Sequence, residues 1–284
     1  MIVVLWGEDK SCKTTFALTF PKPLVIMELD IGGFDRAKYR FKKEIDAGLI
    51  RYEPFIVPFQ IGNFDPANLT VRPSKIVVGM KELFYQFVGK FIQHMTDDTA
   101  TIVVDTGTLL YDITCEGYKQ EKQELQLPLR PDGMGSDGKP LRTILQPVEY
   151  REPYLRLRGI AYQAKSHKKH LVVTHHAADE YDATLQKDGT IANARTGKRE
   201  LHGWGQWGDS ADVILRTYWQ KAVIDPKTKE EITPAGPYCN IELAEIKQLE
   251  GMVIDEPNFD KIDQMIKFFH EQVNNPASKS GILE

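Results

Sequence analysis

The chain has few cysteines and no long apolar run. Its 284 residues include three cysteines, Cys12, Cys115 and Cys239, whose spacing shows no pairing, and this excludes a disulfide framework and a cysteine-based zinc site. No apolar run approaches the roughly 18 residues of a membrane span. A secretory signal has a charged region before its apolar segment and a cleavage site after it. The apolar segment after Met1 has neither. These absences predict a cytoplasmic protein with no membrane partner.

The sequence also lacks an excess of positive charge. Its 36 Lys and Arg residues are outnumbered by 40 Asp and Glu residues, which gives a net charge of −4. Such a chain has no global attraction to nucleic acid, so any binding of that kind must come from a local basic surface. The length and the apolar content of 42% are sufficient to bury a large core.

Short apolar runs alternate with helix-like segments along most of the chain. Strands are predicted at 2–6, 24–29, 101–105 and 170–174, and helices at 13–20, 80–95, 152–169 and 258–272. This alternation predicts an α/β fold with a mostly parallel sheet flanked by helices. A β-ribbon at 213–247 adds antiparallel C-terminal strands. We therefore expect one domain over residues 1–272 and a tail at 273–284.

Two polar segments interrupt this pattern. Residues 120–148 are rich in Gly, Pro and Asp and predict a loop insertion. Residues 179–208 predict a hairpin or a flexible basic excursion, with turn signals at Asp188-Gly189 and Thr196-Gly197. The pattern assigns no function to the insertion or to residues 34–75.

A phosphate-binding loop follows the first predicted strand. The segment 7–14, GEDKSCKT, matches G-x-x-x-x-G-K-[ST] except at one position. In this pattern backbone N–H groups form an anion nest at a helix N-terminus, the lysine reaches the β- and γ-phosphates and the hydroxyl residue binds Mg²⁺. Lys13 and Thr14 have these two roles here. The residues expected to surround the nucleotide phosphates are Gly7, Glu8, Asp9, Lys10, Ser11, Cys12, Lys13, Thr14 and Thr15.

Cys12 stands where the pattern has its second glycine. Glycine suits this position because the backbone crowds the phosphates and can need φ values that a Cβ penalises by roughly 1–2 kcal/mol. Contacts with phosphate, Mg²⁺ and lysine outweigh a cost of this size, so we expect nucleotide binding to survive in weakened form. The alternative is a degenerate loop that binds nothing, and the intact Gly7, Lys13 and Thr14 argue against it.

Two other predicted strands end in carboxylates. Asp105 follows an apolar, β-branched run and fits the Walker B acid that holds the Mg²⁺ shell; the alternative is a helix cap. Glu28 and Asp30 end the second strand and share a face, because side chains alternate along a strand. Either can orient or deprotonate the attacking water. Asp30, followed by two glycines, is the first candidate and Glu28 the second; the alternative for Asp30 is a solvated loop carboxylate.

A pair of histidines, His175 and His176, follows the fourth predicted strand. A P-loop enzyme places a polar residue here that senses the γ-phosphate, and His175 is the preferred candidate for this catalytic role. The alternative is one packed and one solvated imidazole. Zinc binding is disfavoured, because adjacent strand residues cannot both point into one site and no further Cys or His ligands accompany them.

Taken together, these motifs resemble the RecA-like P-loop ATPases that bacteriophages encode, including single-strand-annealing recombination ATPases. The resemblance rests on residues 7–15, 24–33, 101–106, 171–181 and 212–217. It implies a RecA-like P-loop NTPase core that uses ATP and Mg²⁺, with Thr14 and Asp105 at the metal. It also implies that Asp30 corresponds to the catalytic carboxylate, which is usually Glu in the family. The shorter Asp30 and Cys12 predict hydrolysis that is slow or stimulated by DNA or a partner.

The resemblance also implies partners. RecA-like ATPases act as rings or filaments in which a neighbouring subunit contributes a cation to the site, and such a finger is worth about 10³–10⁵ in rate in related chemistry. The candidates for this finger, or for contacts with single-stranded DNA, are Arg195, Lys198, Arg199 and Arg216. A solvated basic loop is the alternative. Trp204 and Trp207 could stack on bases or pack the excursion onto the core.

The resulting hypothesis is a Mg²⁺-dependent ATPase that acts on single-stranded DNA in phage recombination or replication, in the host cytoplasm and together with other phage proteins. One alternative is a motor or helicase-type subunit of a replication or packaging assembly. Another is a protein that binds nucleotide without hydrolysing it and uses it to gate an interaction. A small-molecule kinase is disfavoured because the sequence has no arginine-rich lid.

Overall fold

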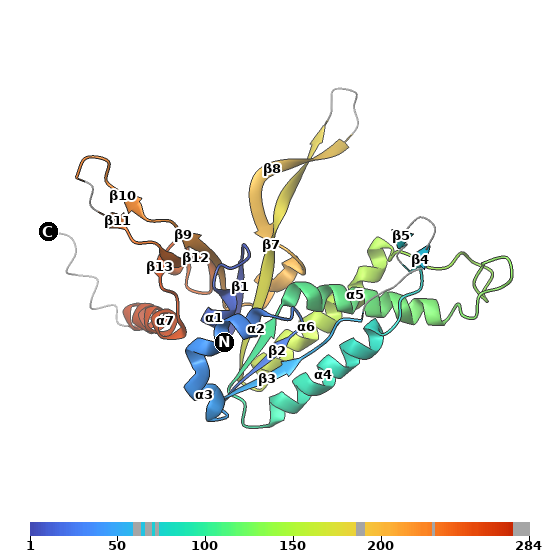
Figure 1. The fold of residues 1–284 in the computed structure, drawn as a ribbon, viewed down its shortest axis with the longest axis horizontal. Coiled ribbons are helices and arrows are strands. Elements are labelled where there is room, and N and C mark those ends of the chain that lie inside the picture. Colours follow the sequence, from blue (N-terminus) through green and yellow to red (C-terminus); the bar gives the residue numbers. More distant parts are fainter. Residues whose placement is uncertain (59–63, 66–69, 72–73, 186–190, 229–230, 275–284) are drawn as a thin grey trace.

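The computed structural model describes residues 1–58, 64–65, 70–71, 74–185, 191–228 and 231–274. Its centre is one mixed sheet in which the strands follow the order β13-β12-β9-β1-β7-β6-β2-β3, with β8 paired to β7 (Figure 1). These strands are β1 (Ile2–Gly7), β2 (Leu24–Glu28), β3 (Ile50–Pro54), β6 (Thr101–Asp105), β7 (His170–Leu185), β8 (Ile191–Leu201), β9 (Val213–Gln220), β12 (Gly236–Ala244) and β13 (Val253–Asp255). Two small ribbons lie outside it, β4 (Phe64–Asp65) with β5 (Thr70–Val71) and β10 (Val223–Ile224) with β11 (Glu231–Thr233).

Helices cover both faces of the sheet. The main helices are α1 (Lys13–Ala17), α2 (Gly33–Ala37), α3 (Lys42–Asp46), α4 (Met80–Thr96), α5 (Gly107–Glu124), α6 (Arg151–Ser166) and α7 (Phe259–Asn274). Short 3₁₀ helices are η1 (Lys38–Phe41), η2 (Pro147–Tyr150), η3 (Gly205–Asp209) and η4 (Lys247–Leu249). Apolar residues of α4, α5 and α6 pack on one face, and those of α1, α2 and α7 pack on the other.

The central strands are parallel because the chain crosses over through a helix between them. β1 pairs in parallel with β7 and β9, and β6 pairs in parallel with β2 and β7, whereas β12 and β13 are antiparallel. All six residues of β1 and all five of β6 are buried, as parallel strands covered on both faces must be. The α/β fold class predicted from the sequence, with a mostly parallel sheet flanked by helices and with antiparallel C-terminal strands, is confirmed by this arrangement.

Two predicted boundaries around the helices need correction. The first helix ends at Ala17 rather than at residue 20, because the N–H groups of Thr19 and Phe20 bond to carbonyls three residues back and tighten the chain before Pro21. The predicted insertion begins after α5, since the buried Gln123 holds the helix to the neighbouring backbone by bonds to Lys75 and Arg142.

The basic excursion is a long antiparallel hairpin. β7 continues past its predicted end at residue 174 to Leu185 and pairs with β8, so the hairpin projects beyond the sheet (Figure 1). The predicted turn at Asp188-Gly189 lies outside the described residues, as does the predicted tail from residue 275 onward. The chain then returns to the core through η3.

Candidate nucleotide site

The carboxyl ends of β1, β2 and β6 lie at one edge of the sheet, beside residues 174–176 of β7, and ligands bind at this edge in open α/β folds. The loop between β1 and α1 lies at this edge. Ser11 and Thr217 of β9 share a hydrogen bond of 2.7 Å that holds the loop to the sheet. Gly7 must be glycine, because a Cβ there would lie 2.1 Å from the carbonyl oxygen of Thr217. The sheet therefore fixes both ends of the loop.

Lys13 is folded into this loop. Its Nζ donates hydrogen bonds to the carbonyl oxygens of Gly7 at 2.9 Å and of Glu8 at 2.8 Å. Burial lowers the pKa of Lys13, and the carboxylate of Asp105 opposes that shift. A phosphate group at the loop would supply the negative charge that favours the ammonium form. The lysine is thus positioned at the loop, as the phosphate-binding pattern requires.

Cys12 adopts the left-handed conformation that the sequence predicts for its position. Its φ is 66° and its ψ is 19°, and no side-chain cap accompanies it. This region costs a residue with a Cβ about 1–2 kcal/mol. Burial raises the pKa of the Cys12 thiol, against the opposing charges of Arg40 and Lys13. The backbone is therefore strained at Cys12, the residue directly before α1.

The strain at Cys12 leads to a first prediction. Cys12→Gly is expected to raise the free energy of unfolding by up to about 1 kcal/mol, because glycine accepts positive φ without cost. Its ATP affinity is expected to equal or exceed that of the unmodified protein, as measured by titration beside thermal unfolding. Cys12→Ala keeps the Cβ and serves as the control, with no gain in stability. A large loss of affinity in the glycine variant would contradict this role for position 12.

Thr14, Asp105 and Glu28 form an oxygen-lined cradle. The Thr14 hydroxyl donates to Asp105 Oδ2 at 2.7 Å, and the Thr174 hydroxyl of β7 donates to Oδ1. A Cβ on Gly33 would lie 2.8 Å from Asp105 Oδ2, 3.0 Å from Thr14 Oγ1 and 3.1 Å from Glu28 Oε1. Three oxygens thus converge on one small space, which only glycine leaves open.

This cradle has the chemistry that Mg²⁺ needs. Magnesium prefers oxygen ligands, keeps several waters and uses one or two carboxylates together with substrate phosphates. Burial raises the pKa of Asp105 against hydrogen bonds from Thr174 and Thr14, and burial likewise raises the pKa of Glu28. A divalent cation would offset the cost of keeping these buried groups ionised. The residues therefore fit Mg²⁺, which Thr14 and Asp105 would hold.

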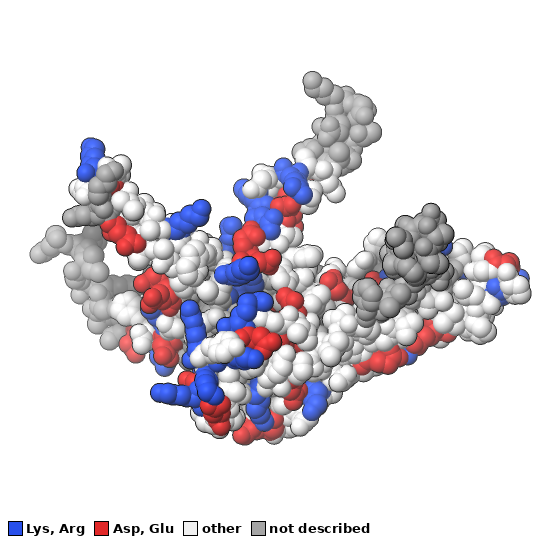
Figure 2. All heavy atoms as spheres, in the orientation of Figure 1, with Lys and Arg blue, Asp and Glu red and all other residues white. Residues whose placement is uncertain are grey.

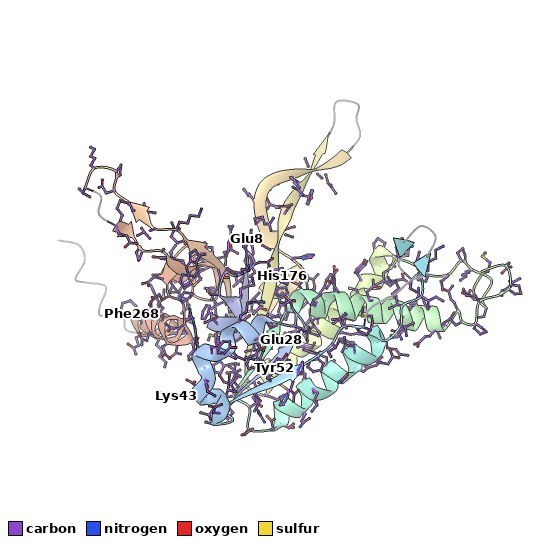
Figure 3. The ribbon with its side chains drawn as sticks, viewed as in Figure 1. Glu8, Glu28, Lys43, Tyr52, His176 and Phe268 are labelled. Carbon is purple, nitrogen blue, oxygen red and sulfur yellow. The ribbon has the colours of Figure 1, made fainter. Side chains whose placement is uncertain are left out.

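The two candidate bases have different environments, because Glu28 is the last residue of β2 and Asp30 lies two residues beyond the end of that strand. Glu28 is fully buried and accepts hydrogen bonds from the Phe34 N–H at 2.7 Å and from the Tyr52 hydroxyl at 2.8 Å (Figure 3). Asp30 is partly exposed, lines the cavity over the loop and has its Oδ2 atom 3.2 Å from Nε2 of His176. Asp30 is thus the carboxylate that water can reach, whereas Glu28 supports the cradle and the start of α2.

The sensor position needs correction. His175 is fully buried, its Nδ1 donates to the His202 carbonyl at 3.0 Å, and its ring lies edge-on to Trp207. It faces the α5 and α6 side of the sheet and does not line the cavity. His176 does line it, and its two ring nitrogens lie 3.2 Å from carboxylate oxygens of Asp9 and Asp30. Strand alternation, applied from Thr174 onward, predicts this outcome.

The burial of His175 leads to a prediction about pH. Desolvation lowers the pKa of His175 to about 3, so between roughly pH 6.5 and 3 the unfolded chain binds a proton there that the folded chain does not. Stability is therefore lost as the pH falls below about 6.5, by up to about 1.4 kcal/mol per pH unit. His175→Gln is expected to make the pH dependence of the unfolding free energy shallower by about one proton. Equal slopes in urea titrations of the two proteins would contradict this.

The cavity over the loop has a volume of about 440 Å³. Cationic side chains that the sequence motifs do not include also line it. Arg36 of α2 and Arg40 of η1 line it, one helical turn apart, beside Lys13. Figure 2 shows Lys and Arg side chains gathered over α2 and α3 and over the base of the hairpin. Two arginines in a phosphate cavity add electrostatic attraction for a polyanion. The sequence signal that could have identified Arg36 and Arg40 is their spacing of four residues, one helical turn, in the segment after the second strand.

The four cations predicted to contact DNA or a neighbouring subunit divide into groups. Arg216 of β9 lies over the ring of Trp6, 5.0 Å from its centroid, away from the cavity. Arg195 and Lys198 are exposed on β8, where Arg195 pairs with Asp179 at 2.9 Å. Arg199 instead reaches the phosphate loop of its own chain. Among the hairpin residues that the structure describes, Arg195 and Lys198 are exposed cations, whereas Arg199 contacts the loop.

Arg199 connects the hairpin to the loop by several bonds. Its Nε lies 2.9 Å from Glu8 Oε1, and its guanidinium also donates to Asp179 at 2.6 Å and to the Ala177 carbonyl at 3.2 Å. Figure 3 shows Glu8 and His176 near the base of the hairpin. Nη2 of Arg199 donates to Glu8 Oε2 at 3.1 Å, and a hydrogen bond between charged groups is stronger than one between neutral groups. A movement of the hairpin would thus act on Glu8 through Arg199.

Trp204 and Trp207 do not offer a surface for bases. Each is 1% exposed, and their rings pack edge-on with centroids 4.7 Å apart. They belong to the core under α5 and α6. Of the two alternatives that the sequence left open for these residues, packing onto the core is correct and base stacking is wrong. Their burial explains how η3 anchors the return of the hairpin.

Comparisons with known proteins found matches among solved structures. No family model matches the chain and no curated protein matches it. Among solved structures, the chain is similar to a KaiC-like protein from the hyperthermophilic archaeon Pyrococcus horikoshii OT3, with 13% identity and a TM-score of 0.42 over 89% of this chain and 82% of that one. In the part of the chain that the structure describes, no helix is long and apolar enough to cross a membrane.

Proposed function

We propose that this protein binds ATP together with Mg²⁺ and hydrolyses it as a RecA-like P-loop ATPase. The observation that carries the proposal is the bond between Thr14, directly after the loop lysine, and Asp105, at the end of β6. In P-loop NTPases the hydroxyl binds the metal directly and the acid holds its shell, so the two must meet across the sheet. Lys13, Arg36 and Arg40 supply the positive charge for the phosphates.

The chain's own residues can assist the transfer of the γ-phosphoryl group to water. When bound, Mg²⁺ supplies charge neutralisation at the phosphates. Lys13 holds the phosphate oxygens, the loop backbone orients the chain of phosphates, and Asp30 accepts a proton from the water that it orients. His176 holds the Asp30 carboxylate through its Nε2 at 3.2 Å. Catalysis in such sites is mainly positioning and charge stabilisation.

We further propose that the protein acts on single-stranded DNA in phage recombination or replication, as a ring or filament with other phage proteins as partners. The phage setting rests on the resemblance of the sequence motifs alone. The projecting hairpin with exposed Arg195 and Lys198 supports a contact with DNA phosphates. Such contacts supply affinity that falls with salt and does not depend on sequence.

The proposal is tested by ATP turnover with and without single-stranded DNA, with DNA retention measured at low salt. We expect Mg²⁺-dependent turnover that DNA raises, and assembly of the protein in the presence of ATP and DNA, as measured by mass photometry. Absence of both turnover and DNA retention would reject the proposal. ATP binding without any turnover would instead support the alternative in which the protein binds nucleotide without hydrolysing it and so gates an interaction, which Cys12 and the short Asp30 favour.

The contacts of Arg199 predict that DNA binding and its effect on turnover can be separated. Lys198→Ala is expected to weaken DNA binding and to reduce its salt slope by about one, because one phosphate contact is lost. Stimulation by saturating DNA is retained in this variant. Arg199→Ala breaks the link to Glu8 and is expected to lose that stimulation even at saturating DNA. If the two variants behave alike in both assays, Arg199 does not couple the hairpin to the loop.

A further inference from the structure

A second cavity, of about 390 Å³, continues from the phosphate cavity along α1. Cys12, Thr15 and Arg40 line both of them, so the two spaces share a wall at the start of the helix. Thr15 follows the residue that we place at the metal. A ligand whose phosphates lie over the loop would therefore extend past Thr15 into this second space.

The walls of the second cavity differ in chemistry from those of the first. They are mostly aromatic or apolar, and the residues that contribute are Phe16, Phe41, Trp219, Pro237 and Pro257. Glu256 also lines the cavity, and its carboxylate would repel another anion. This space is thus unsuited to phosphate and suited to a neutral, planar group.

The fold places Trp219 at this point. Side chains alternate along β9, so Trp219 lies on the same face as the buried Leu215 and as Thr217, which holds Ser11 of the loop. Trp219 also pairs with Pro237 of β12 in the sheet. Its side chain is nevertheless 56% exposed, whereas Trp6, Trp204 and Trp207 are at most 4% exposed. A large aromatic ring is therefore left uncovered beside the phosphate loop.

We propose that this second cavity is the base-binding subsite of the nucleotide, in which the purine packs against Trp219 and Phe41. This inference rests on the proposed function and adds the residues that recognise the base. Flat aromatic rings suit such a ligand, because every base has a π-face on which they can stack. Arg40, at the junction of the two cavities, lies where the base-bearing end of the ligand joins its phosphates.

Collisional quenching tests the proposal directly, because Trp219 is the exposed tryptophan of the four. Acrylamide quenching of tryptophan emission is measured on the full chain with Mg²⁺ alone, with Mg²⁺ and ATP, and with Mg²⁺ and inorganic tripolyphosphate. We expect ATP to protect the accessible tryptophan and tripolyphosphate to leave it accessible. Equal protection by the two ligands, or none by ATP at saturation, would overturn the proposal.

Affinity measurements on variants give a second readout. Trp219→Ala is expected to weaken ATP binding at least tenfold and to leave tripolyphosphate affinity within twofold, while Trp219→Phe keeps a ring and retains most of the ATP affinity. Ile224→Ala, at a residue of the neighbouring ribbon that is also 56% exposed, is the matched control with no effect on either ligand. An equal loss for both ligands in Trp219→Ala overturns the base subsite but not the proposed function. If neither ligand binds the unmodified protein, both fail.

Discussion

Replacing Gly33 by alanine is expected to remove Mg²⁺-dependent ATP binding and turnover while leaving the fold intact. The new Cβ would stand within 3.1 Å of three oxygens, those of Asp105, Thr14 and Glu28. It would fill the space in which we place the metal and its water. Metal ions contribute several kcal/mol of charge stabilisation, so the expected loss is about 100-fold or more at 1.4 kcal/mol per factor of ten.

The measurement is ATP affinity with Mg²⁺ and with EDTA, beside kcat and a thermal melt. Gly89→Ala is the matched control, because Gly89 lies inside α4 with nothing within 4 Å of its Cβ position. That variant should gain stability by up to about 1 kcal/mol and bind Mg²⁺ and ATP normally. An unchanged Mg²⁺ dependence in Gly33→Ala would show that the metal does not lie in the cradle.

The sequence predicts the central sheet well, because its strands are buried on both faces. The runs at 2–6, 24–29 and 101–105 have no competing helical period, and their lengths match β1, β2 and β6 within one residue. The boundaries that fail depend on tertiary contacts. Examples are the buried Gln123, which extends α5 into a polar segment, and the strand pairing that carries β7 to Leu185.

The candidate site could be predicted where it depends on short-range pattern. The loop, the left-handed Cys12 and the position of Asp105 at a strand end all follow from local sequence. Thr14 and Asp105 are separated by 91 residues in the sequence. Their contact could be predicted only from the rule that parallel strands end at the same edge of a sheet. Arg36 and Arg40 were not identified, because a basic helical segment is usually a solvated face.

The ion pairs of the hairpin could not be predicted from the sequence, for a different reason. Its turn signals and charges were visible in the sequence, but the partners of the charges were not. Arg195 and Arg199 both pair with Asp179, and Arg199 alone also reaches Glu8 of the loop. Register between the two strands decides which cation points to the nucleotide site, and register is set by pairing along the whole hairpin. Equivalent residues in the sequence thus acquire different roles in the fold.

Asp105→Asn is expected to separate activity from stability. The buried carboxylate has a raised pKa, so its ionised form is costly in the folded protein without metal. A neutral amide of the same size avoids that cost and keeps one oxygen that can accept from Thr14 or Thr174. We therefore expect a melting temperature equal to or above that of the unmodified protein. Turnover should fall about 100-fold or more, since the acid that holds the metal shell is lost.

The pH dependence of stability, compared between the unmodified protein and Asp105→Asn, tests this prediction most directly. Because the folded pKa of Asp105 is raised, the unmodified protein binds a proton there more readily when folded, and its stability is lost as the pH rises through that pKa. The stability advantage of Asp105→Asn should therefore shrink as the pH falls, in metal-free urea titrations. Asp35→Asn, at an exposed carboxylate of α2, should change neither turnover nor this slope. If Asp105→Asn instead loses stability and activity together at every pH, the carboxylate serves the fold and not the metal.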